Sequence, residues 1–65
     1  MNAIGRNIII KKLKEGITTV VSTGSECDGI NKDDVIYYDR HAGHKIELDK
    51  ETYHVIKAQD VVFVL

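Results

Sequence analysis

Short runs of β-branched and aromatic residues, separated by glycine and polar turn residues, are the feature that most limits the fold of this sequence. The runs are residues 7–13 (NIIIKKL), 16–22 (GITTVVS), 35–38 (VIYY), 45–49 (KIELD), 52–57 (TYHVIK) and 61–65 (VVFVL). Side chains of this kind favour strands, and strands at this spacing are typical of small barrels and sandwiches. No window of the sequence supports a long helix. The sequence therefore predicts an all-β fold of five to six short strands.

The segments between these runs are rich in residues that form turns. Residues 24–34 collect Gly, Ser, Asp and Asn, and they predict a loop. Residues 39–43 predict a turn in which Gly43 has a positive φ. Lys50 and Glu51 form a two-residue polar break, which predicts a tight hairpin, and residues 58–60 form a short connector.

The size of the chain makes association with other chains the expected source of additional stability. A domain of 65 residues buries only about 60% of the surface that its unfolded chain exposes. Cys27 is the only cysteine, so no intrachain disulfide can form. No Cys/His cluster has the spacing of a structural zinc site.

The two end strands are expected to pair between subunits. Residues 61–65 are apolar on both faces, and residues 8–10 are equally unsuited to an exposed edge. Pairing the last strand of one copy with the first strand of the next is a head-to-tail contact, which closes a ring or extends a filament. The predicted subunit interface consists of Ile8, Ile9, Ile10, Val61, Val62, Phe63, Val64 and Leu65.

The net charge of −1 argues against bulk attraction to nucleic acid or membrane. Lys11, Lys12 and Lys14 form a basic strip, but three lysines beside strands that are expected to pack favour a solvated face over a nucleic-acid site. No apolar run approaches the roughly 20 residues of a membrane helix, and no signal peptide is evident. We expect a cytoplasmic protein.

The polar residues do not form a recognisable catalytic, cofactor or metal site. His41 and His44 lie near Asp39, but a flexible turn without a fourth ligand does not predict a metal centre. Cys27 lies between two carboxylates, which disfavour the thiolate that nucleophilic catalysis needs. No phosphate-binding loop is present. We expect no enzyme activity, no cofactor and no bound metal.

The order of short patterns from Asn31 onward resembles the carboxyl-terminal half of GroES-type co-chaperonins. The segments that carry the resemblance are residues 32–38 (KDDVIYY), 41–43 (HAG), 45–49 (KIELD), 51–56 (ETYHVI) and 60–62 (DVV), together with residues 4–11 (IGRNIIIK). The resemblance implies a single GroES-like β-barrel domain over residues 1–65. It also implies assembly into a homo-oligomer.

The chain departs from the pattern of this family at several positions. Asp33-Asp34 stands where the family usually has Gly-Asp, Ala58 stands where it has a glutamate, and a proline near the start is missing. Only 21 residues separate Leu13 from Val35, too few for the mobile loop and the roof hairpin of the family. The favoured alignment places residues 16–24 on the strand after a deleted mobile loop. The alternative places residues 16–20 on the apolar segment of that loop.

The apparent loss of the docking loop leads to two functional hypotheses. The first is a structural or interaction subunit that self-associates or decorates a larger assembly such as a viral particle, without binding a chaperonin. The alternative is a co-chaperonin that caps a chaperonin ring.

Overall fold

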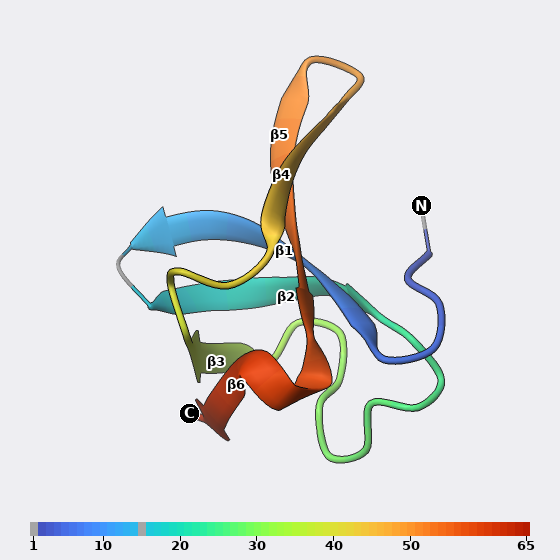
Figure 1. The fold of residues 1–65 in the computed structure, drawn as a ribbon, viewed down its shortest axis with the longest axis vertical. Coiled ribbons are helices and arrows are strands. Elements are labelled where there is room, and N and C mark those ends of the chain that lie inside the picture. Colours follow the sequence, from blue (N-terminus) through green and yellow to red (C-terminus); the bar gives the residue numbers. More distant parts are fainter. Residues whose placement is uncertain (1, 15) are drawn as a thin grey trace.

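The structure, a computed structural model, describes residues 2–14 and 16–65, apart from the side chains of residues 12–14. Its elements are β1 (Asn7–Lys14), β2 (Ile17–Thr23), β3 (Val35–Tyr38), β4 (His44–Leu48), β5 (Glu51–Lys57), the short 3₁₀ helix η1 (Ala58–Asp60) and β6 (Val61–Val64). Figure 1 shows how they are arranged. The predicted all-β fold of five to six strands is confirmed, with six strands present.

All six strands belong to one antiparallel sheet in the order β4-β5-β1-β2-β3-β6. The first strand lies inside the sheet, because β1 pairs with β2 on one side and its residues 7–10 pair with β5 on the other. The two edges are β4 and β6. The β4–β5 hairpin projects beyond the rest of the molecule (Figure 1).

The sheet curls around one core, as expected of a small GroES-like barrel. Five strands or connections contribute to this core, whose buried members are Ile8, Ile10, Val20, Cys27, Ile30, Ile36, Tyr38 and Ile56. Two shifts of register help the sheet to bend: Val21 is an extra residue in β2 opposite β1, and Val62 is an extra residue in β6 opposite β3. Such bulges increase the local twist of a strand, so distant strands can face one another across the core.

The loop between β2 and β3 is fastened to the segment that precedes β1. The backbone N–H of Gly24 donates to Asn7 O at 2.9 Å, and that of Glu26 donates to Gly5 O at 2.9 Å. A Cβ on Gly24 would lie 2.1 Å from the Gly5 carbonyl oxygen, so only glycine permits this approach. The Cys27 thiol is buried beneath the same contact, with Sγ 3.6 Å from Asn7 O.

The hairpin between β4 and β5 differs by one residue from the prediction. Its two turn residues are Asp49 and Lys50, both with positive φ, and Glu51 already belongs to β5. Two successive positive φ values match the twist of the flanking strands, and this geometry outweighs the simple polarity of Lys50-Glu51. Leu48, expected on a half-buried face, is 44% exposed because the hairpin extends past the core. Gly43 has the predicted positive φ, at 79°.

Asp33 provides a test of backbone strain. Its φ is 73°, although it carries a side chain, and its N–H donates to Val20 O at 2.9 Å. This conformation explains why glycine suits the position, since a left-handed residue with a Cβ costs about 1–2 kcal/mol.

We expect Asp33→Gly to raise the free energy of unfolding by roughly 0.5–1 kcal/mol, because the relieved strain exceeds the added freedom of the unfolded chain. Urea denaturation measures the change. Asp28→Gly is the control, since Asp28 lies in the same loop without a positive φ. Equal stability changes for the two variants would contradict the assignment of strain to Asp33.

Tyr38 is a second testable feature of the core. The residue is 2% exposed, and its hydroxyl has no hydrogen-bond partner among the described residues. Burial disfavours the ionised phenolate, so it raises the pKa of Tyr38 above the usual 10.0. The unfolded chain therefore loses this proton at a lower pH than the folded chain does.

We expect the stability that depends on protonated Tyr38 to persist below pH 10 and to be lost as the pH rises through the higher pKa of the folded state. Tyr38→Phe should keep the stability of the wild type at pH 7 to within about 1 kcal/mol, since it removes a hydroxyl without a partner. It should also lose less stability at alkaline pH. Thermal melts at several pH values measure both effects, and identical alkaline profiles for the two proteins would contradict the prediction.

Candidate interaction surface

The two edges of the sheet differ in character. On β4 the exposed side chains include His44, Lys45 and Glu47, and charged groups of this kind discourage pairing with another chain. On β6 the residues from Val62 to Leu65 are all apolar and 41–65% exposed. Among the described residues, the β4 edge is thus protected from pairing by charged side chains, whereas the β6 edge is apolar and open to pairing.

Strand β6 is held by β3, and their contact forms an apolar patch on the outer face of the sheet. Tyr37 and Phe63 are paired across the two strands, with ring centroids 5.2 Å apart and planes 19° apart. Ile17 lies opposite Tyr37 on β2, so the three side chains form one row. Val35 and Leu65 lie in the next row, joined by a hydrogen bond of 2.8 Å from Leu65 N–H to Val35 O. We call these five residues the outer patch.

The three isoleucines of the predicted interface have different positions. Ile8 and Ile10 are fully buried in the core, so the partners that they need lie within the same chain. Ile9 points to the other face and is 7% exposed. It lines a groove of about 340 Å³, whose other lining residues are Asn2, Ala3, Ile4, Asn7, His44 and Val55.

The groove extends the candidate surface to the segment before β1. Ala3 N–H donates to Ser22 Oγ at 3.0 Å, which holds this segment against the outer face of the sheet. Ile4 lies beside the groove and is 78% exposed. Ile4 was not predicted as a surface residue, because it is a single large apolar side chain outside the runs that predict strands.

Tyr37 and Ile17 were also missed as surface residues. Alternation along β3 carried a usable signal, because residues 35 and 37 must face away from residues 36 and 38. The structure follows this rule: Ile36 and Tyr38 are buried, whereas Val35 and Tyr37 are 40% and 39% exposed. What the pattern did not show is which pair faces the core.

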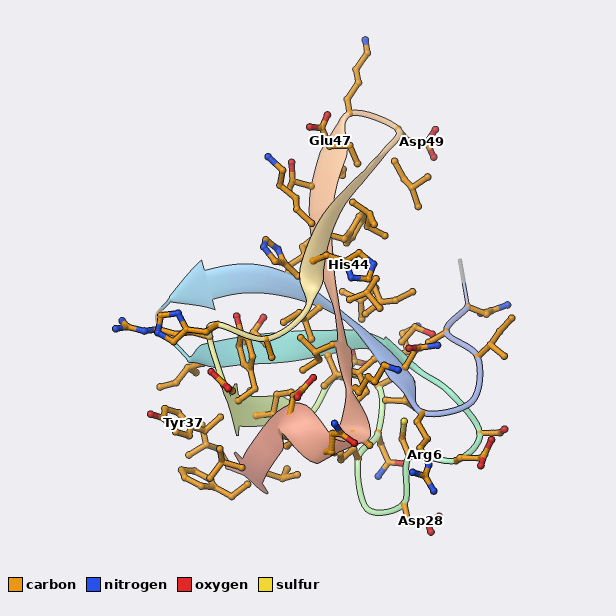
Figure 2. All side chains as sticks on the ribbon, in the orientation of Figure 1. Arg6, Asp28, Tyr37, His44, Glu47 and Asp49 are labelled. Atoms are coloured by element: carbon orange, nitrogen blue, oxygen red, sulfur yellow. The ribbon has the colours of Figure 1, made fainter. Side chains whose placement is uncertain are left out.

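The polar candidates do not converge on a chemical site. His41 N–H donates to Asp39 Oδ1 at 2.9 Å, which is a local turn contact, and His44 lies near the base of the β4–β5 hairpin (Figure 2). Within residues 2–14 and 16–65, no three His, Cys, Asp or Glu side chains are grouped as metal ligands. Of the basic strip, Lys11 is described, and the side chains of Lys12 and Lys14 lie outside the described residues.

Searching the described residues for a helix long and apolar enough to span a bilayer finds none.

An open apolar strand edge, a groove and an outer patch are features typical of proteins that bind other proteins. Comparison with known proteins agrees with this class. The family model of the chaperonin 10 kDa subunit matches residues 4–65. The chain therefore belongs to the chaperonin 10 kDa subunit family, and the resemblance to GroES-type co-chaperonins is confirmed.

Two relatives are co-chaperonins by name. The co-chaperonin GroES of Sulfurovum sp. (strain NBC37-1) is 25% identical over 80 residues, which cover 95% of this chain and 93% of the relative. The co-chaperonin GroES of Thermodesulfovibrio yellowstonii is 32% identical over 56 residues, which cover 86% of this chain. The chain spans 64% of that second relative's length.

The first hypothesis, a structural module that decorates an assembly such as a viral particle, is wrong. The family model and both relatives point instead to the alternative, a co-chaperonin. That hypothesis rested on the short connections of the chain, which are real: an alignment of 80 positions leaves at least 15 without a residue in this 65-residue chain. Such shortening occurs within the family and does not exclude a chain from it.

Proposed function

We propose that this chain is a non-catalytic co-chaperonin subunit that assembles with copies of itself, caps a chaperonin ring and works in the cytoplasm as a single domain. The observation that carries the proposal is the family match over residues 4–65. The open edge at β6 supports it, because an uncovered apolar strand on a small barrel calls for a partner.

For the contact between copies, we propose that β6 of one subunit pairs along the amino-terminal side of the next. This proposal retains fewer residues than the interface expected from the sequence. Residues 61–65 supply the strand, and Ile9 supplies part of the groove that receives it. Ile8 and Ile10 stabilise that groove from inside the barrel rather than touching the partner. The apolar side chains of β6 match the Ile4, Ile9 and Val55 side chains of the groove.

For the contact with a chaperonin, the end of the barrel near Ile17 is the candidate region. Residues 17–23 form strand β2, so the alignment that places them on a strand is the one that agrees with the fold. Ile17 begins this strand and is 40% exposed. With no long loop between β1 and β2, an apolar contact at this end has to use side chains of the barrel itself.

We expect the purified protein to co-elute with a chaperonin ring in a nucleotide-dependent manner on size-exclusion chromatography. Ile17→Ser should weaken the association, while Leu48→Ser should not, because Leu48 is an equally exposed residue on the projecting hairpin. Absence of co-elution for the wild type under every nucleotide condition would contradict the co-chaperonin assignment. Equal binding by both variants would move the contact away from Ile17 and leave the assignment intact.

A second prediction concerns assembly. We expect Phe63→Lys to abolish the oligomer and to give unfolded or aggregated chain, because a charge enters the β6 strand and the stack on Tyr37 is lost. Leu48→Lys is the matched control and should assemble normally. Light scattering coupled to chromatography measures the mass. If Phe63→Lys, or truncation before Val61, keeps the mass of the wild-type oligomer, β6 is not the subunit contact. A stable folded monomer after truncation would instead show that the fold does not depend on that contact.

A further inference from the structure

The outer part of the β4–β5 hairpin lies beyond the barrel. Strand β5 pairs with β1 only through residues 54–57, and residues 46–53 pair with one another across the hairpin. We call residues 46–53 the arm. In Figure 1 the arm projects from the rest of the sheet, and in Figure 2 Glu47 and Asp49 lie near its tip.

The arm has little packing of its own. Ile46 and Tyr53 are half-buried, whereas residues 47–52 are all exposed. A two-stranded ribbon of this kind is marginally stable in water without a third strand or a core. The two positive φ values at Asp49 and Lys50 add strain at its tip, because neither residue is glycine.

The Lys11 side chain of the barrel contacts two residues on the β5 strand of the arm. The Lys11 ammonium nitrogen lies 3.4 Å from Glu51 Oε2 and 5.6 Å from the centroid of the Tyr53 ring. Lys11 belongs to β1 just beyond the residues that pair with β5, so it spans the place where the arm leaves the sheet. It contacts both a charged and an aromatic residue of the arm.

Two of these residues also line a cleft. Lys11 and Tyr53 line a space of about 360 Å³, together with Thr19, Val20, Val21, Lys32 and Asp33. Movement of Tyr53 away from Lys11 would widen this cleft and release the Lys11 ammonium group.

We propose that the arm is a latched element that opens and closes independently of the barrel, with Lys11 as the latch. In the closed state Lys11 contacts Glu51 and Tyr53, and Tyr53 forms one wall of the cleft. In the open state the ladder of residues 46–53 separates while β1, β2 and β3 stay paired. The proposal does not depend on the partner of the protein, because it concerns contacts within one chain.

Amide hydrogen exchange of the intact protein tests the proposal residue by residue. Lys11→Met keeps the aliphatic stem and removes the charge, so it should speed exchange in the arm roughly two- to fivefold, given the modest strength of exposed ion pairs and cation–π contacts. Exchange in β1 and β2 should not change. Lys32→Met is the matched control, since Lys32 lines the same cleft and is exposed, and it should leave the arm unaffected.

The dependence of exchange on salt concentration provides a second test. Raising NaCl from about 0.05 to about 1 M screens the ion pair, so exchange in the arm of the wild type should accelerate. The Lys11→Met protein should respond less, because its latch is already broken. The proposal is overturned if arm exchange is the same in wild type and Lys11→Met, or if Lys11→Met speeds the arm and β2 equally, which would indicate global destabilisation.

Discussion

The burial of β1 between two neighbouring strands is the constraint on which the rest of the structure depends. Ile8 and Ile10 lie at the centre of the core, and the backbone on both sides of them is paired. Because β1 occupies the middle of the sheet, the edges fall to β4 and β6. The location of the open edge, the groove beside Ile9 and the departure of the arm all follow from the position of this one strand.

The sequence was sufficient to predict the strands and insufficient to predict their order. Branched residues such as those of β1 and β2 favour extended backbone locally, so each strand could be recognised from its own residues. Which strands are neighbours depends on contacts between distant residues, and no local pattern reports them. Ile8 and Ile10 were predicted to lie at a subunit interface, and no local pattern indicated that β2 and β5 of the same chain are their neighbours.

The candidate surface, like the fold, was predictable from the sequence only in its local features. The apolar character of residues 61–65 was visible in the sequence. That Tyr37 faces outward could not be predicted, because the sequence does not show which face of β3 packs against the core. The turn was predicted at Lys50-Glu51, one residue after its actual position at Asp49-Lys50. Both turn residues have a positive φ, which their residue types do not indicate. The first functional hypothesis was wrong for another reason. The short connections of the chain were interpreted as the loss of the co-chaperonin role, although the chain keeps the match to the family over residues 4–65.

The difference between the two sheet edges has a consequence for the protein before it is assembled. A newly made copy carries the exposed β6 strand, whose apolar side chains and free backbone groups can pair with any extended polypeptide nearby. The lone subunit is therefore the vulnerable species. In the proposed assembly the edge of β6 is covered, so the balance between assembly and aggregation depends on how fast a free subunit meets its partner compared with how fast it meets another exposed strand.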